Sequence, residues 1–263
     1  MGDDWSAISA RIDLADTRIS ELTRACQAIV ESTDVAVEHV QVTGEGLHRL
    51  VLRAPISVPQ SAGLLLSDAA HQLRSALDNM VWQLVLANGV VPPVRNNLAF
   101  PVVEDKTKYA ERARVALKGV HEDVRNWFER FHGFDMPERS EAFEDIVLLS
   151  KVNNYDKHRF LHAGSALIAA PLIPERVGIR ALDNIHSVQL EFHNNVGAQP
   201  DGAVLHGIRV RPVGAQLEFD LSGVSLDVQI GILFGDDLAV NAHRMERTSH
   251  TVRRLLQELS EFL

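Results

Sequence analysis

Residues 61–87 read SAGLLLSDAAHQLRSALDNMVWQLVLA, and this stretch decides the fold of the first half of the chain. Apolar side chains recur along it in steps of three and four, which is the period of an α-helix. They are Leu66, Ala70, Leu73, Leu77, Met80 and Leu84. Trp82 and Val85 add apolar area on other faces, and Asn88 and Gly89 follow as a C-terminal stop signal. Because a helix that is apolar nearly all round is buried on more than one side, we predict that residues 61–87 form the central helix.

A second long helix is predicted before it, from Asp4 to Glu31. Its apolar residues form one narrow seam. They are Trp5, Ile8, Ile12, Ala15, Ile19, Leu22, Cys26 and Ile29. Such a seam packs either on the core of its own chain or on a second copy, so a homodimer is an alternative to intramolecular packing. Between the two helices, β-rich runs on either side of residues 43–46, which read TGEG, predict a β-hairpin.

The rest of the chain divides into a helical part and a β-rich part. Residues 90–103 contain several prolines and predict an extended connection, which leads into two charged helices between Glu104 and Phe131. A further helix is predicted over 139–160, and a final one from Leu238 onward. Between these two helices, turn residues separate short runs typical of β-strands. The runs are 167–173, 177–182, 188–192, 204–210, 217–221 and 228–234.

These elements predict an α+β protein. Its helical half, with the N-terminal hairpin, is expected to pack on an antiparallel β-sheet and to be closed by the C-terminal helix, with the first and last helices adjacent. The composition changes near residue 162. This change predicts a mainly helical region over 1–162 and an antiparallel β region with a C-terminal helix over 163–263. A single domain that contains both regions is the alternative.

The composition excludes several classes of protein. The chain has 263 residues, of which 46% are hydrophobic, and a net charge of -9, which is typical of a globular protein. It has no run of about 18 apolar residues, so no membrane span is expected. Asp3 and Asp4 stand where a signal peptide would be basic, which favours a cytoplasmic protein, and the single Cys26 excludes disulfides within the chain. The negative charge disfavours a broad nucleic-acid surface but is compatible with a small basic pocket. Acidic residues interrupt the basic run over 106–118, which we interpret as a solvated helix face.

One group of polar residues on the central helix points to chemistry. His71, Arg74 and Asp78 lie at steps of three and four, so they share a helix face opposite the main apolar stripe. On a helix that is buried on two sides, these side chains are expected to be at least partly buried. Buried charges are costly unless they are paired and hydrogen-bonded, so the three residues need partners.

The predicted helix over 139–160 offers these partners. Its apolar stripe turns polar over the last two turns. The polar residues are Ser150, Asn154, Lys157 and His158. If the two helices pack together, His158 or His71 is a candidate acid–base group and Asp78 a carboxylate that orients it. Arg74, Asn154 and Lys157 are then candidates for binding an anionic substrate. The alternative is a polar network that only fixes the register of the two helices.

The motifs on these helices resemble a group of actinobacterial and phage proteins of unassigned function. The matching segments are SDAAHQLRSALDN at 67–79, FP at 100–101 and NNYDKHR at 153–159. Members of the group carry an H-x-L-R-S-A-L-D-H helix, an F-P-I-type segment and an N-x-x-D-K-H-R run. The resemblance covers residues 60–162 and implies no particular activity.

A second resemblance is to the HEPN ribonuclease superfamily, whose helical bundles use an R-x4-6-H motif. Arg74 matches the arginine, but Asn79 stands where the histidine would be. Only His158, on another helix, could substitute for it. This resemblance implies RNA as a substrate and metal-free phosphodiester cleavage as the reaction.

A metal site and a cofactor site are both disfavoured. His71, Asp78 and His158 could form a two-histidine, one-carboxylate set, but Arg74 and Lys157 would place positive charge beside the cation, so no metal is expected. The sequence contains none of the glycine-rich loops that cradle phosphates, and no cofactor is expected.

Three hypotheses for the function follow. The first is an enzyme that acts on an anionic or phosphate-bearing substrate, with HEPN-like ribonuclease activity as its most concrete form. The second is a module that binds a small acidic ligand in the same cationic pocket. The third is a structural or assembly protein, in which the polar cluster only fixes helix register.

Overall fold

The computed structural model shows an α+β protein, as predicted from the sequence. It describes residues 2–33, 36–42, 44–53, 58–92, 97–158, 165–168, 178–192, 197–198, 202, 204–221, 228–234 and 238–263. The chain forms two compact units. The helical unit contains Met1–Thr23, Ser61–Leu161 and Ala242–Leu263, and the β unit contains Arg24–Gln60 and His162–Asn241. The N-terminal hairpin thus belongs to the β unit and the C-terminal helix to the helical unit. The boundary near residue 162 that the composition predicts assigns the hairpin to the helical region and the C-terminal helix to the β region.

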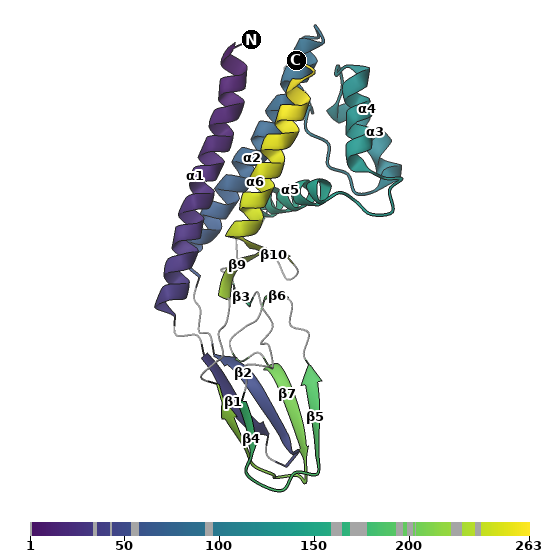
Figure 1. The fold of residues 1–263 in the computed structure, drawn as a ribbon. Helices are drawn as coiled ribbons and strands as arrows, with labels where there is room; N and C mark the ends of the chain where they lie inside the picture. Colours follow the sequence, from purple (N-terminus) through teal and green to yellow (C-terminus); the bar gives the residue numbers. More distant parts are fainter. Residues whose placement is uncertain are drawn as a thin grey trace. The chain divides into compact units, whose positions relative to one another are not determined.

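Three long helices run side by side in the helical unit (Figure 1). They are α1 (Gly2–Ser32), whose first part belongs to this unit, α2 (Gln60–Ala87) and α6 (Ala242–Ser260). Every residue of the predicted α2 stripe is at most 2% exposed, which confirms the central helix. Asp16 of α1 accepts hydrogen bonds from Ser249 at 2.5 Å and from Arg253 at 2.6 Å, so the first and last helices are adjacent as expected.

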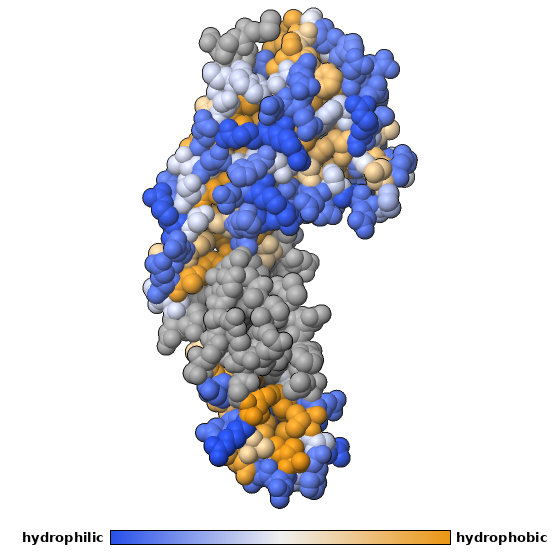
Figure 2. Space-filling model, viewed as in Figure 1, coloured by the Kyte–Doolittle hydropathy of each residue, from blue (hydrophilic) through white to orange (hydrophobic). Residues whose placement is uncertain are grey.

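The apolar seam of α1 packs within the chain. Ile8, Ile12, Ala15, Ile19 and Leu22 are each at most 4% exposed. The outer side of the helical unit is mainly hydrophilic in the space-filling view (Figure 2). These five seam residues therefore pack within the chain, as the intramolecular interpretation predicts, while Trp5 at the start of the seam is 37% exposed. The homodimer stays a prediction.

The described part of the helical unit also contains three shorter helices. They are α3 (Lys106–Ala116), α4 (Glu122–His132) and α5 (Glu141–His158). A buried carboxylate ties α5 to α6: Asp145, 1% exposed, lies 2.8 Å from Arg247 and 3.3 Å from Arg244, and it accepts a hydrogen bond from Thr251 at 3.0 Å. Three groups thus pair with this buried carboxylate, as a buried charge requires.

An aromatic cluster holds α4 against the segment that precedes α3. Phe100, which lies in that segment, packs edge-on against Phe128 and Phe131 of α4, with ring centroids 5.0 and 5.8 Å apart. His132 is fully buried in the same cluster, and its Nδ1–H donates to the Phe128 carbonyl at 2.7 Å. Burial lowers the pKa of His132 to about 4, so this ring is neutral at pH 7.

Among the residues that the structure describes, the β unit contains three antiparallel sheets. The first has the order β1-β2-β7-β5, in which the predicted hairpin pairs with a strand from the second half of the chain. Its strands are β1 (Ala36–Val42), β2 (Leu47–Arg53), β7 (Val204–Arg211) and β5 (Ser187–Phe192). Gly46, in the hairpin turn, has a φ of +60°, and a Cβ there would lie 2.6 Å from the Val210 carbonyl oxygen. Only glycine allows this approach of the turn to β7.

The other two sheets are smaller. One has the order β10-β9-β3-β6, and β4 pairs with β8. Their strands are β3 (Ser165–Ile168), β4 (Gly178–Ala181), β6 (Gly197–Ala198), β8 (Leu217–Asp220), β9 (Val228–Phe234) and β10 (Leu238–Asn241). The prediction that the last helix begins at Leu238 is wrong. Residues 238–241 pair with β9 as a strand, and the helix begins at Ala242. Pairing with a neighbouring strand is a tertiary interaction that helical periodicity does not detect.

Replacing Asp145 should destabilise the helical unit. The Asp145→Ala substitution removes the acceptor shared by Arg247 and Thr251, and we expect the free energy of unfolding to fall by about 3 kcal/mol. Urea denaturation followed by circular dichroism measures this change. The matched control is Asp13→Ala: the Asp13 side chain is 70% exposed and its ion pair with Arg253 is 3.5 Å long, so its loss should cost less than about 1 kcal/mol. Equal losses in the two variants would contradict the assigned role of Asp145.

His132 should make the protein sensitive to acid. Its folded-state pKa of about 4 lies below the ordinary 6.5, so the unfolded chain takes up the proton first and stability is lost as the pH falls from 6.5 towards 4. The substitution His132→Phe should reduce the loss of unfolding free energy between pH 7 and pH 4 by about 3 kcal/mol. Urea denaturation at both pH values checks this. His250→Gln, at an exposed position, is the control and should keep the wild-type difference. A His132→Phe variant as acid-sensitive as the wild type would overturn the prediction.

Candidate functional site

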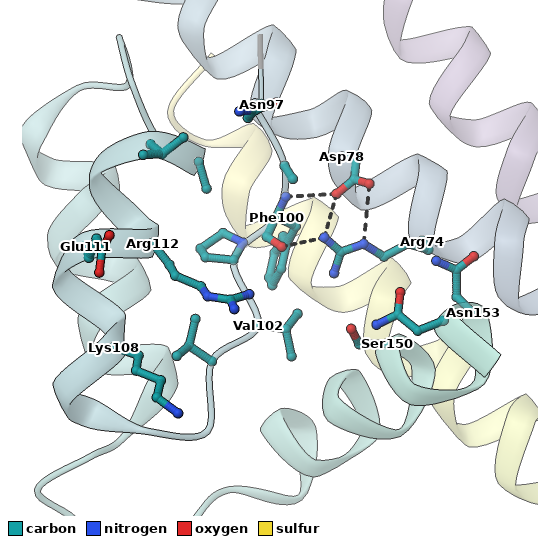
Figure 3. A pocket seen from close by; sticks show the side chains of 16 residues that line it. Arg74, Asp78, Asn97, Phe100, Val102, Lys108, Glu111, Arg112, Ser150 and Asn153 are labelled. Atoms are coloured by element: carbon teal, nitrogen blue, oxygen red, sulfur yellow. Dashed lines mark hydrogen bonds and ion pairs between the residues drawn. The ribbon is translucent and has the colours of Figure 1, made fainter. Parts of the chain in front are cut away.

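A pocket of about 810 Å³ opens in the helical unit (Figure 3). Its walls come from α2, α3, α5 and the irregular segment 97–103 between α2 and α3. This volume lies in the range of sites that hold small molecules and cofactors. The two helices that carried the predicted polar residues, α2 and α5, therefore meet at a pocket.

Arg74 and Asp78 hold the segment 97–103 in place. The Arg74 Nη2–H donates to the Phe100 carbonyl at 2.6 Å, and the Phe100 N–H donates to Asp78 Oδ1 at 2.8 Å. The two side chains are also paired with each other, with Arg74 Nη2 2.9 Å from Oδ1 and Nε 3.3 Å from Oδ2 of Asp78. Both polar groups of Phe100 are thus satisfied by one ion pair, which we call the clamp. It fixes the wall of the pocket.

The clamp leaves little net charge at the α2 wall. Asp78 neutralises Arg74, whose side chain is 14% exposed. The remaining nitrogen, Nη1, is enclosed and has no hydrogen-bond partner among the residues that the structure describes. Arg74 is thus paired with Asp78 and hydrogen-bonded to the Phe100 carbonyl, so it offers a ligand less charge than an unpaired guanidinium would.

The α3 wall carries the available positive charge. Lys108 and Arg112 lie four residues apart on one face of α3, with Glu111 beside them, and all three are exposed lining residues. Lys108 lies 3.5 Å from Asp105, which caps the helix by accepting from the Thr107 N–H. Arg112 makes no ion pair or hydrogen bond with any described residue, and its guanidinium extends towards Phe100 and Val102 in Figure 3. The cation at this wall is free to pair with a ligand.

The α5 wall is polar and uncharged. Ser150, Asn153 and Asn154 line it, and Ser150 and Asn153 face the Arg74 end of the pocket (Figure 3). Asn153 is only 5% exposed, yet its side-chain amide has no hydrogen-bond partner in the described part of the chain. Its amide is not among the enclosed polar atoms that lack a partner, so it is open to the pocket and can bind a group that enters there.

The structure brings together three of the six residues that the sequence singled out. Arg74, Asp78 and Asn154 line the pocket. His71 shares their helix face, but it lies about 10 Å along the axis from Asp78. It is exposed and lines a separate hollow beside Arg18 and Asp68.

The roles assigned to the other residues are not all supported. Both oxygens of Asp78 are occupied by Arg74, and Oδ1 also accepts from the Phe100 N–H, so the structure gives this carboxylate a different partner from the histidine that we expected it to orient. The backbone of α5 extends to His158, but the side chains of Lys157 and His158 lie outside the described residues. Their proposed roles in anion binding and acid–base chemistry stay predictions.

Sequence reasoning missed three residues of the site. Lys108 and Arg112 were interpreted as part of a solvated helix face, although their spacing of four residues could have shown that they share a side of α3. Asn153 was quoted only within a motif. Its position follows Ile146 and Leu149 at steps of three and four, and both of these are fully buried, so a polar residue at this point of the stripe was a usable signal.

Comparison with known proteins adds no functional assignment: no family model, no curated protein and no solved structure matches the chain. Within the described ranges, no group of three or more histidine, cysteine, aspartate or glutamate residues is placed to hold a metal ion. None of the helices in those ranges is long and apolar enough to cross a membrane.

Breaking the clamp should loosen the pocket wall. In Asp78→Ala the Phe100 N–H loses its acceptor, a loss of about 1–3 kcal/mol for a hydrogen bond to a charged group. We expect the Phe100 amide to exchange with deuterium at least about tenfold faster, as measured by NMR. Asp68→Ala is the control, because Asp68 is on the same helix but pairs with Arg18 at 2.7 Å, away from Phe100. Unchanged exchange in Asp78→Ala would show that the segment is held without the Asp78 hydrogen bond.

Proposed function

We propose that the helical unit binds a small anionic ligand in the pocket between α2, α3 and α5. The observation that supports this most directly is Arg112, a guanidinium that borders the pocket and has no partner among the described residues. Lys108 adds a second positive charge on the same face of α3, and Glu111 adds one negative charge there. Guanidinium groups bind carboxylates and phosphates through paired, charge-assisted hydrogen bonds.

A binding module fits the lining better than an enzyme does. Among the described residues, the lining contains no histidine, cysteine or tyrosine, and Asp78 is committed to the clamp. General acid–base chemistry needs a titratable group within hydrogen-bond reach of the reacting atoms. Outside the clamp, the lining includes the ionisable side chains of Glu111 and Lys108, and the histidine that HEPN-like cleavage of RNA would need is His158, whose side chain lies outside the described residues. That hypothesis is tested by comparing turnover and binding in His158→Ala.

A purely structural role applies to one part of the cluster. Arg74 and Asp78 hold the segment around Phe100, which is the kind of register function that the third hypothesis assigns to the whole cluster. Arg112 and Asn153 make no such contact with the described chain. The clamp thus builds the pocket, and the proposal assigns ligand binding to the residues that surround it.

Removing the charge of Arg112 should weaken ligand binding without affecting the fold. With phenyl phosphate as the probe, Arg112→Gln should raise the dissociation constant about tenfold, the loss of one charge-assisted contact. Isothermal titration calorimetry at low ionic strength measures this change, and added salt should reduce the difference. The matched control is Arg114→Gln, because Arg114 is exposed on the same helix but does not line the pocket. Equal weakening in both variants would mean that the probe senses only general surface charge, and the proposal would fail.

A further inference from the structure

Asn153 indicates what the rest of the ligand is. It continues the stripe of α5 that contains Ile146 and Leu149, both 0% exposed, and it is itself only 5% exposed. Its amide nevertheless lines the pocket and has no hydrogen-bond partner in the described chain. The amide is not among the enclosed polar atoms that lack a partner, so it is open to the pocket. A ligand that excludes water from the pocket must therefore replace the hydrogen bonds of this amide.

The charges around Asn153 are balanced, which argues against an anionic group of the ligand in the part of the pocket beside α5. The nearest cation, Arg74, is neutralised by Asp78 at 2.9 Å. The other polar lining groups on α5 are the neutral side chains of Ser150 and Asn154. A carboxylate or phosphate placed here would satisfy the Asn153 NH₂ group but would set its own oxygens against the Asn153 carbonyl oxygen.

A side-chain amide is best satisfied by another amide-type group. It presents a donor and an acceptor side by side, so a planar –CO–NH– group on the ligand can form two antiparallel hydrogen bonds with it. Pro101, Val102 and Val115 supply apolar surface in the same pocket, which suits a planar ring with few polar atoms on its faces. The free cation on α3 lies across the pocket from α5 (Figure 3).

We propose that the ligand of this pocket carries two different recognition groups, an anion bound by Arg112 and Lys108 and a planar amide of the lactam or carboxamide type bound by Asn153. This inference rests on the proposed function, because it concerns the same pocket. It goes further by naming the ligand class: an amide-bearing acid or phosphate ester, in which the amide determines specificity. Asn153 is then the residue that separates this class from simple anions.

Two probes that share the anionic group test the inference on the full-length protein. Uridine 5′-phosphate contains a phosphate and a lactam, and ribose 5-phosphate has the same phosphate and sugar without the lactam. We expect uridine 5′-phosphate to bind about tenfold more tightly by isothermal titration calorimetry, the effect of satisfying one buried amide. In Asn153→Leu this advantage should disappear, while the affinity for ribose 5-phosphate stays within about twofold of the wild type.

A methylated probe separates the contribution of hydrogen bonding from that of ring contacts. A second variant replaces the first if the first does not fold. N3-methyluridine 5′-phosphate keeps the ring but lacks the lactam N–H, so it should bind the wild type less tightly than uridine 5′-phosphate does, and the two nucleotides should bind Asn153→Leu alike. Asn153→Ala, which removes the amide without adding bulk, serves if Asn153→Leu fails to melt cooperatively. It should remove the preference for uridine 5′-phosphate and leave the affinity for ribose 5-phosphate within about twofold of the wild type.

The outcomes distinguish the two proposals. If both phosphates bind equally to the wild type, or if Asn153→Leu keeps the preference for the lactam, the amide inference is overturned while anion binding stands. If neither phosphate binds, or if Arg112→Gln binds both as tightly as the wild type does, the proposed function itself fails, and the inference fails with it.

Discussion

The hydrogen-bonded pairing of the Arg74–Asp78 ion pair with the Phe100 peptide group is the interaction on which the rest of the site depends. It satisfies the N–H and the carbonyl of one residue in an irregular segment, next to Ala99, whose N–H donates to the Ala116 carbonyl of α3 at 3.3 Å. The ring of the same residue is anchored among the aromatic side chains of α4. A segment fixed through both its backbone and its side chain can form a pocket wall, whereas an irregular connection with neither constraint would not keep one shape.

The charges of the helical unit fall into two groups with different consequences. Asp145 with Arg244 and Arg247, Asp16 with Arg253, and the clamp are ion pairs between groups of the protein itself, so they stabilise the helical unit and offer little to a ligand. The cations of α3 belong to the second group, because they border the pocket on an exposed helix. A chain with a net charge of -9 can therefore still attract an anion, since the field inside a pocket depends on the nearest charges more than on the total.

Much of the secondary structure could be predicted, because the periodicity that reports it is local. The steps of three and four identified α1 and α2 and the face that each buries, and the alternating runs around residues 43–46 identified the hairpin. The errors arose where distant residues decide the outcome. Residues 238–241 form a strand because β9 is beside them, and His71 is outside the pocket because the clamped segment covers only the Asp78 end of α2.

The sequence by itself determined that this is an α+β protein, that α2 is its buried central helix, and that polar residues interrupt the faces of two helices. Each of these properties depends on neighbours within a few turns of the chain. Only the tertiary structure decided which polar residues are already satisfied. Asp78 meets a backbone N–H 22 residues away, while Asn153 and Arg112 are left without partners in the described chain. Charge compensation and hydrogen bonding depend on contacts between distant segments, and the periodicity of the sequence does not reveal those contacts.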